Sequence, residues 1–111
     1  MRDHFHEFEI SPELVREMIE AGEDLILLDV RDDWEWEKAH IEGAIHIPVS
    51  ELADRVEELD RNQETIVYCH VGERSIDGCL LLWESGFRRL RNMTGGIEAW
   101  SELVDPTIPR Y

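Results

Sequence analysis

Two continuous apolar runs constrain the fold of this chain more than any other feature of its sequence. Residues 25–30 read Leu-Ile-Leu-Leu-Asp-Val, and residues 65–68 read Thr-Ile-Val-Tyr. Neither run alternates between apolar and polar residues, as a strand with one solvent-facing side would. Such runs are typical of strands covered on both faces, which occur in parallel sheets flanked by helices. We therefore expect an α/β fold built on a central parallel sheet.

The segments around these runs contain the start and stop signals of helices. Ser11-Pro12 matches an N-cap followed by proline at the first helical position, and Ser50 is predicted to cap another helix. Further helices are expected over residues 32–38, 75–85 and 97–103, and short strands over residues 8–10, 44–48 and 89–93. Strands that alternate with helices favour parallel pairing with helical crossovers.

The spacing of apolar residues predicts which face of each helix is buried. In the first helix the expected inner face contains Leu14, Val15, Met18 and Ile19. In the helix after Ser75 it contains Ile76, Cys79, Leu80 and Trp83. The helix after Ser50 is expected to bury Leu52, Val56 and Leu59.

Length and composition fit one domain over residues 1–111, with a core over roughly residues 8–104. The 111 residues are 42% hydrophobic, which is enough for one core at this size. No apolar stretch is long enough to span a membrane, and the first residues lack the apolar segment of a signal peptide. A cytoplasmic protein that contacts no membrane is expected.

The charge is strongly negative. Eleven Lys and Arg residues oppose 26 Asp and Glu residues, which gives a net charge of −15. Such a surface repels nucleic acid and anionic membranes. It is consistent either with a surface adapted to solubility or salt, or with attraction to a basic partner protein.

Cys69 is the candidate nucleophile, because it comes directly after an expected buried strand, and we expect its thiol at the mouth of the loop that follows. Ligands of open α/β sheets gather at the carboxyl ends of the strands. The short loop after Cys69 leads into a helix N-terminus, where successive backbone N–H groups form an anion-binding nest and Gly72 allows a tight turn. N–H donors and the cation Arg74 favour the thiolate, and they would also stabilise a persulfide anion on Cys69.

These residues resemble the active-site loop of the rhodanese family, C-x-x-G-x-R-S. The match is Cys69-His70-Val71-Gly72-Glu73-Arg74-Ser75. Four further matches follow the family order along nearly the whole chain: Asp29-Val30-Arg31, the segment from His40 to Pro48, Gly86-Phe87, and the segment from Met93 to Trp100. The resemblance implies a rhodanese-like three-layer fold, with a five-stranded parallel sheet flanked by helices.

The resemblance also implies the chemistry. A sulfane sulfur moves from a donor such as thiosulfate, through a persulfide on Cys69, to a thiol or cyanide acceptor, with no cofactor and no metal. By position, the residues whose amides would hold the sulfur are His70, Val71, Gly72, Glu73, Arg74 and Ser75. Arg74 is expected to bind an anionic donor and to shape the loop. Asp29 and Arg31 are expected to support the site as an ion pair or to frame its pocket.

Several residues allow two interpretations. Cys79 is either a resolving thiol for Cys69 or a small apolar core residue, and its helical spacing favours the core. His70 is either a general base or a loop residue that points to solvent, and the second is favoured.

His40 and His46 are expected to be structural. Trp83 and Trp100 fit packing positions, whereas at least one of Trp34 and Trp36 is expected to be exposed.

Two other functions remain open. One is a relay domain that receives sulfur from another protein and passes it to a partner, and the acidic surface fits a basic partner. The other is a Cdc25-type phosphatase or arsenate reductase on the same fold. The second is disfavoured because the spacing from Cys69 to Arg74 is one residue shorter than the H-C-x5-R loop of those enzymes. Glu73 and the acidic surface predict weak activity with the thiosulfate dianion, improving with added salt.

Overall fold

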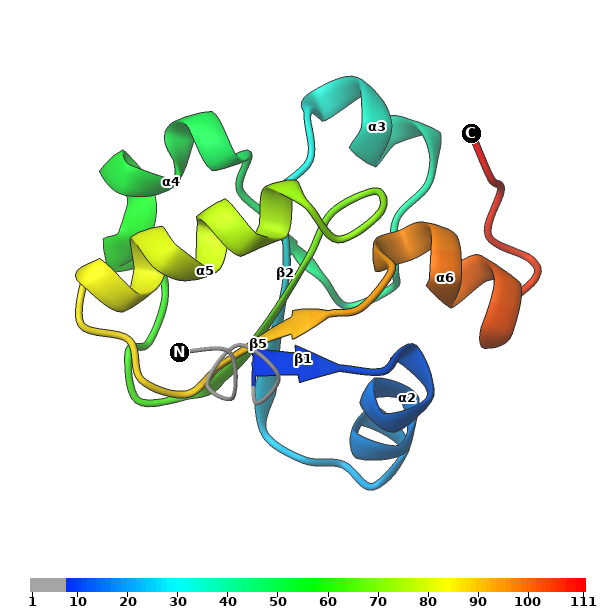
Figure 1. Ribbon diagram of the computed structural model, residues 1–111, viewed down its shortest axis with the longest axis horizontal. Coiled ribbons are helices and arrows are strands. Elements are labelled where there is room, and N and C mark those ends of the chain that lie inside the picture. Colours follow the sequence, from blue (N-terminus) through cyan, green and yellow to red (C-terminus); the bar gives the residue numbers. More distant parts are fainter. Residues whose placement is uncertain (1–7) are drawn as a thin grey trace.

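The central sheet has five strands, all parallel, in the order β1-β5-β4-β2-β3. The computed structural model describes residues 8–111 (Figure 1). The strands are β1 (Glu9–Ile10), β2 (Leu25–Asp29), β3 (Ile45–His46), β4 (Glu64–Tyr68) and β5 (Leu90–Met93). Each lies within or beside a segment predicted to be a strand. The two apolar runs, β2 and β4, are neighbours in the sheet, as their burial on both faces requires.

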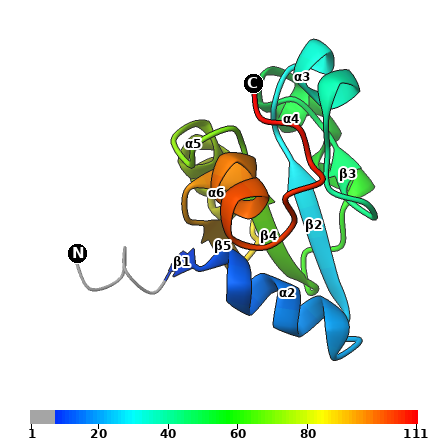
Figure 2. The ribbon, with the colours of Figure 1, turned by 90° about the vertical axis from the view of Figure 1, so that its right-hand side faces the viewer.

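Helices cover both faces of this sheet, which gives three layers (Figure 2). The helical elements are α2 (Pro12–Glu20), α3 (Asp33–Lys38), α4 (Val49–Arg55), the 3-10 turn η1 (Val56–Glu58), α5 (Arg74–Glu84) and α6 (Gly96–Leu103). Helices α4 and α5 pack together on one face, and α2 and α6 pack together on the other. Helix α3 follows the carboxyl end of β2. The predicted α/β architecture is confirmed.

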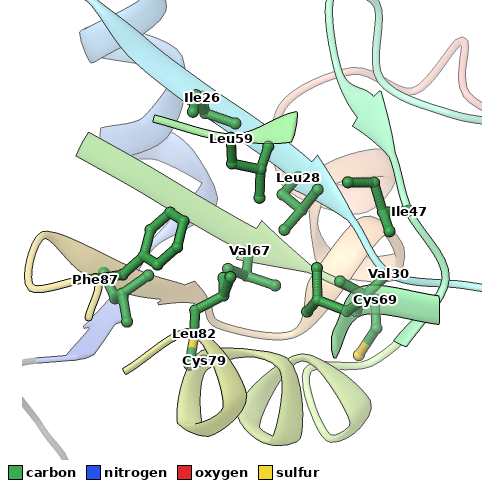
Figure 3. Close-up of a cluster of buried hydrophobic side chains, with 12 residues drawn as sticks. Ile26, Leu28, Val30, Ile47, Leu59, Val67, Cys69, Cys79, Leu82 and Phe87 are labelled. Atoms are coloured by element: carbon green, nitrogen blue, oxygen red, sulfur yellow. The ribbon is translucent and has the colours of Figure 1, made fainter. Parts of the chain in front are cut away.

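Two apolar clusters form because successive side chains of a strand point to opposite faces. Ile26, Leu28 and Val67 lie in the cluster under α4 and α5 (Figure 3). Leu27 and Ile66 lie in the cluster under α2 and α6. The middle strands therefore bury side chains on both sides.

The buried face of α5 differs from the predicted one. Its buried residues are Ser75, Gly78, Cys79 and Leu82. Leu80 and Trp83, which were expected inside, are 54% and 42% exposed. At Gly78 an added Cβ would be in ordinary contact with Val67 at 3.4 Å, so this side of the helix lies directly on the sheet. The stripe that carries the small residues Ser75, Gly78 and Cys79 faces the sheet, and Leu80 and Trp83 turn outward.

Two other helix predictions are partly wrong. The side chain of Ser11 does cap α2, accepting a hydrogen bond from the N–H of Leu14 at 3.2 Å. Only Val15 on this helix's expected inner face is fully buried, whereas Leu14 and Ile19 are 45% and 39% exposed. Helix α4 begins at Val49, so Ser50 lies inside it and is not its cap.

The segment after α6 returns toward α3, and its last residue ends beside that helix (Figures 1 and 2). The hydroxyl of Ser101 donates to the carbonyl of Ile108 at 2.6 Å and fixes this return. Ile108 and Tyr111 pack against the cluster under α2 and α6. Every helix within residues 8–111 is too short or too polar to traverse a lipid bilayer.

Candidate active site

Cys69 follows the last residue of β4 and precedes the loop into α5, as predicted. Its side chain belongs to the cluster under α4 and α5, and only 1% of the residue is exposed (Figure 3). The sequence placed this thiol at the mouth of the loop. It lies instead beneath the loop, because residue 69 continues the inward alternation of Val67. Reagents therefore reach the sulfur only past the loop residues.

The sulfur of Cys69 contacts two polar groups. The backbone N–H of Gly72 donates a hydrogen bond to Sγ at 3.2 Å, and Ser75 Oγ lies 3.3 Å from Sγ. Gly72 has φ of +96°, a backbone conformation that favours glycine. The tight turn predicted at Gly72 therefore exists, and it points one main-chain donor at the sulfur.

Asn92 on β5 determines the direction of the Ser75 hydrogen bonds. Its Nδ2 donates to the carbonyl of Gly72 at 3.2 Å and to Glu9 Oε2 at 2.9 Å. With both acceptors on the nitrogen side, Oδ1 of Asn92 is the group that accepts the hydroxyl proton of Ser75. Ser75 then offers a lone pair to Cys69, so it accepts a hydrogen bond from the thiol form.

The first N–H groups of helix α6 bind the carbonyl groups of the two residues that begin the loop. The N–H of Ile97 donates to the carbonyl of Cys69 at 2.9 Å, and the N–H of Glu98 donates to that of His70 at 3.0 Å. Gly96 allows this approach: its φ is +60°, and a Cβ there would lie 2.5 Å from the carbonyl oxygen of His70. Only glycine fits between the helix and the loop.

The N–H groups of His70 and Val71 point away from α6, because each shares a trans peptide with a carbonyl that α6 binds, and the N–H and C=O of a trans peptide have opposite directions. Among residues 8–111, no acceptor pairs with the N–H groups of His70, Val71 or Glu73. The N–H of Gly72 is directed at the sulfur, and these three N–H groups belong to the same short loop. An anion is the natural ligand of such a group.

The guanidinium of Arg74 is already paired. Its Nη1 and Nη2 donate to Glu35 Oε1 and Oε2 at 2.6 and 2.8 Å. This bidentate contact joins the end of the loop to α3 and neutralises the cation. Of the two predicted roles of Arg74, the geometry favours shaping the loop over binding an anionic donor.

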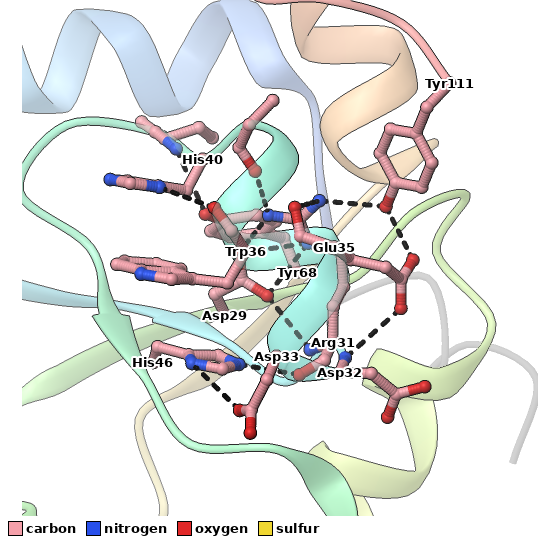
Figure 4. Close-up of polar contacts among 12 residues, drawn as sticks. Asp29, Arg31, Asp32, Asp33, Glu35, Trp36, His40, His46, Tyr68 and Tyr111 are labelled. Carbon is pink, nitrogen blue, oxygen red and sulfur yellow. Dashed lines mark hydrogen bonds and ion pairs between the residues drawn. The ribbon is translucent and has the colours of Figure 1, made fainter.

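Glu35 is 3% exposed, yet its carboxylate is fully hydrogen-bonded (Figure 4). Besides Arg74, it accepts from the hydroxyl of Tyr111 at 2.6 Å and from the N–H of Asp32 at 3.1 Å. Burial alone would raise the pKa of Glu35, but the hydrogen bonds from Arg74 and Tyr111 lower it from 4.5 to about 2. The carboxylate therefore stays charged.

Asp29 and Arg31 form a buried ion pair at the end of β2. The shortest contact, from Arg31 Nη2 to Asp29 Oδ2, is 2.6 Å, and both side chains have no exposed surface. Arg31 also donates to the carbonyl of Ala39 at 2.6 Å and to the hydroxyl of Tyr111 at 2.8 Å. Burial lowers the pKa of Arg31, but the bonds to Asp29 and Tyr111 more than offset this and raise it. The pair fastens the segment that carries Glu35.

His70 does not point freely to solvent. Its ring stacks on Tyr111, with centroids 4.1 Å apart and an interplanar angle of 14°. Its Nε2 lies 3.8 Å from Glu98 Oε1, too far for a hydrogen bond. The side chain is therefore held against the segment after α6, and no acceptor within residues 8–111 pairs with its main-chain N–H.

Cys79 is a core residue, as its spacing favoured. It is 7% exposed and packs in the same cluster as Leu82 and Phe87. Burial, with smaller effects of Glu9 and Cys69, raises its pKa to about 12. Both Cys69 and Cys79 are free thiols. A thiol that ionises so reluctantly is a poor resolving nucleophile.

The aromatic predictions are mostly confirmed. Trp36 lies between the rings of His40 and His46, at centroid distances of 3.7 and 4.8 Å, which makes both histidines structural. Trp34 is 58% exposed and Trp100 is 3% exposed, as expected. Trp83 is the exception among the packing positions, because it lies on the outer side of α5.

Three residues of the site were missed in the sequence. Glu35 stands three residues after Asp32, the spacing of a helix capping box, so its position carried a signal. Asn92 is a polar residue inside a predicted strand, which marks a buried hydrogen-bonding role. Tyr111 follows no periodic pattern, and only the tertiary structure brings it to the site.

Known proteins resemble this chain over most of its length. The family model of the rhodanese-like domain matches residues 11–103. "Putative sulfur carrier protein YrkF" of Bacillus subtilis is 39% identical over 93 residues, and "Putative sulfurtransferase YtwF" of the same organism is 39% identical over 98 residues. These alignments cover 84% and 88% of this chain, 50% of YrkF and 94% of YtwF. The chain thus spans half the length of YrkF.

A solved structure agrees with the sequence comparisons. The crystal structure of a rhodanese-related protein from Thermoplasma volcanium superposes with a TM-score of 0.80 at 29% identity, covering 93% of this chain and 98% of that one. The family match includes the whole loop from Cys69 to Ser75 and the glycine that α6 places against it. The chain belongs to the rhodanese-like domain family.

Proposed function

We propose that Cys69 transfers a sulfane sulfur by way of a persulfide, with thiosulfate as the simplest donor. The Cys69 thiolate attacks the outer sulfur of thiosulfate. The bond between the two sulfurs of thiosulfate breaks, and sulfite leaves with its electron pair. A thiolate or cyanide then attacks the outer sulfur of the persulfide, which forms thiocyanate from cyanide and regenerates the Cys69 thiolate.

The observation that supports this proposal most is the N–H of Gly72, 3.2 Å from Sγ, beside unpaired N–H groups of the same loop. An outer sulfur bonded to Sγ would carry the negative charge among these donors. Hydrogen bonds to a charged acceptor contribute about 1.5–3 kcal/mol each. In this proposal the loop residues bind the sulfur through their amides: His70, Val71, Gly72, Glu73, Arg74 and Ser75.

The first step needs the donor sulfur to reach the buried Sγ past the loop, but the second step does not need an exposed Sγ. A sulfur–sulfur bond is about 2.05 Å long, so the outer atom of a persulfide reaches that far beyond Sγ. An acceptor would attack this outer atom and not the buried Sγ. The proposed role of Asp29 and Arg31 is support, since their ion pair holds the segment before Glu35.

The electrostatics favour a protein donor or acceptor over free thiosulfate. Glu35 neutralises Arg74, Glu73 is exposed, and the chain carries a net charge of −15. A dianion is repelled by such a surface, whereas a basic sulfur-relay protein is attracted. YrkF, one of the similar proteins, has a name that describes a sulfur carrier. We therefore propose that the physiological partner is a protein, with thiosulfate a weak substitute.

A phosphatase or arsenate reductase is less well supported. Those reactions need a loop cation that is free to bind an oxyanion, and both terminal guanidinium nitrogens of Arg74 are bonded to Glu35. We further propose that residues 1–111 act as one domain in the cytoplasm, where the two free thiols would remain reduced.

Intact-mass measurement after exposure to thiosulfate tests the proposal. Wild type and Cys79→Ser are expected to gain about one sulfur mass, ~32 Da, and to lose it again with cyanide. Cys69→Ser is expected to gain nothing. An adduct that persists in Cys69→Ser would place the chemistry elsewhere.

A salt series then tests whether the acidic surface repels thiosulfate. If the acidic surface repels thiosulfate, kcat/KM for thiosulfate rises as salt screens the charges, over a distance of about 8–10 Å at ordinary ionic strength. A rate that does not change with salt would contradict this part of the proposal.

A further inference from the structure

Tyr111 lies outside the part of the chain that the family match covers, residues 11–103, yet its side chain reaches the candidate site. The segment after α6 returns along that helix (Figure 1). The ring of Tyr111 contacts His70 on the loop and Trp34 on α3. Family membership therefore gives Tyr111 no role. Its contacts have to be interpreted from this structure.

The hydroxyl of Tyr111 joins two buried charged groups. It donates to Glu35 Oε2 at 2.6 Å and accepts from Arg31 Nη1 at 2.8 Å. Glu35 in turn holds both guanidinium nitrogens of Arg74, the residue that ends the loop. Burial and the bond to Glu35 raise the pKa of Tyr111 to about 12. The phenol therefore stays protonated and remains a donor to Glu35.

The ring of Tyr111 contacts the other end of the loop. It stacks on His70, the residue after Cys69, at a centroid distance of 4.1 Å. Trp34 packs edge-on against the same ring at 5.7 Å, and the guanidinium of Arg31 lies 5.6 Å from its centroid. One side chain is thus held from several sides while it touches the beginning of the loop and, through Glu35, its end.

We propose that Tyr111 is a positioning residue for the persulfide loop. It holds His70 by ring stacking and Arg74 through Glu35, and so keeps the loop in the conformation that directs the N–H of Gly72 at the sulfur of Cys69. This inference rests on the proposed function for its consequence in sulfur transfer. Its structural content, the orientation of the loop around the thiol, is independent of what the sulfur donor is.

Two substitutions separate the ring from the hydroxyl. Tyr111→Phe keeps the stack on His70 and removes the bonds to Glu35 and Arg31, whereas Tyr111→Ala removes both. Tyr68→Phe is the matched control. Tyr68 is the only other tyrosine, and its hydroxyl accepts from the N–H of Ile41 at 3.2 Å.

The primary readout is the pH profile of alkylation of Cys69 by iodoacetamide, measured in a Cys79→Ala background. Loss of the directed amides disfavours the thiolate, so the half-maximal rate of Tyr111→Ala is expected about half a pH unit or more above that of the parent. Tyr111→Phe is expected to show only a small part of this shift, because it keeps the ring stack on His70, and Tyr68→Phe is expected to show no shift. These comparisons use samples whose folded fraction has been matched by circular dichroism.

The second readout is single-turnover persulfide formation at saturating thiosulfate. The rate is expected to fall about tenfold in Tyr111→Ala and about threefold in Tyr111→Phe, with the half-saturating concentration nearly unchanged. An unshifted alkylation profile in both Tyr111 variants would overturn the positioning role. So would an equal shift in Tyr68→Phe. A wild type that alkylates as expected but takes up no sulfur would contradict the proposed function alone.

If Tyr111→Ala does not fold, Tyr111→Phe and a cycle with His70→Ala decide the question. The proposed path from the ring to the loop runs through His70. The shift of the alkylation profile in the double variant Tyr111→Leu/His70→Ala is therefore expected to be smaller than the sum of the shifts in the two single variants. Full additivity, with an unshifted profile in Tyr111→Phe, would overturn the inference.

Discussion

The guanidinium of Arg74 lies against the carboxylate of Glu35, with nitrogen–oxygen distances of 2.6 and 2.8 Å. Glu35 is 3% exposed, so this contact joins the end of the loop to the buried side of α3. The cation of the loop motif is therefore a structural group in this protein. The main-chain N–H of Gly72, and not this cation, donates to Sγ of Cys69.

Replacing Glu35 with Gln is expected to lower the free energy of unfolding by about 2–4 kcal/mol, because it removes the charge that Arg74 faces in a buried site. Urea denaturation measures this loss. The matched control is Glu37→Gln, an exposed glutamate of the same helix, which is expected to change stability by less than about 0.5 kcal/mol. Equal effects of the two substitutions would contradict the structural role of the pair.

The same pair predicts how stability changes with pH. The pKa of Glu35 is lowered from 4.5 to about 2, so the unfolded chain binds this proton at a higher pH than the folded chain. The contribution is complete above about pH 4.5 and is lost as the pH falls toward 2. The difference in unfolding free energy between wild type and Glu35→Gln should therefore shrink by about 2–3 kcal/mol over this range. A difference that stays constant from pH 5 to pH 2 would show that Glu35 titrates normally.

Gly96→Ala is expected to disable the loop. The residue has φ of +60°, and a Cβ there would lie 2.5 Å from the carbonyl oxygen of His70, so the loop and α6 have to separate. Stability is expected to fall by more than about 2 kcal/mol, and persulfide formation on Cys69 by more than about 100-fold. Gly22→Ala is the control, since φ there is +74° but no atom lies within 4 Å of the added Cβ. It is expected to lose some stability and keep its activity.

Cys79→Ala is expected to leave sulfur transfer unchanged and to cost about 1 kcal/mol of stability through a small cavity. Because the pKa of Cys79 is raised to about 12, iodoacetamide at pH 8 should label Cys69 and leave Cys79 unmodified in the folded protein. Peptide mapping after labelling distinguishes the two thiols. A Cys69–Cys79 disulfide formed under mild oxidation would revive the resolving role.

The sequence predicted the sheet and the loop well because both depend on local features. The apolar runs of β2 and β4 require covering layers on both faces, and Cys69 to Ser75 is a continuous motif whose position follows from the strand before it. The inner face of α5 was predicted less well. Periodicity favoured Leu80 and Trp83, but the close approach at Gly78 selected a different stripe of the helix.

The parts of the site that the sequence did not indicate depend on contacts between distant segments. Tyr111 meets Glu35 across 76 residues, and Ser75 meets Asn92 across 17. The depth of Cys69 was also missed, because a strand-end residue can face either the loop or the core. Only the packing of β4 against α5 decides between these two orientations.

A crystal structure of the protein after reaction with thiosulfate tests the central claim most directly. It is expected to contain one additional sulfur on Sγ of Cys69, about 2.05 Å away and within hydrogen-bonding distance of two or more of the N–H groups of residues 70–73. An additional sulfur that points away from these amides, or a modified protein without sulfur on Cys69, would contradict the account.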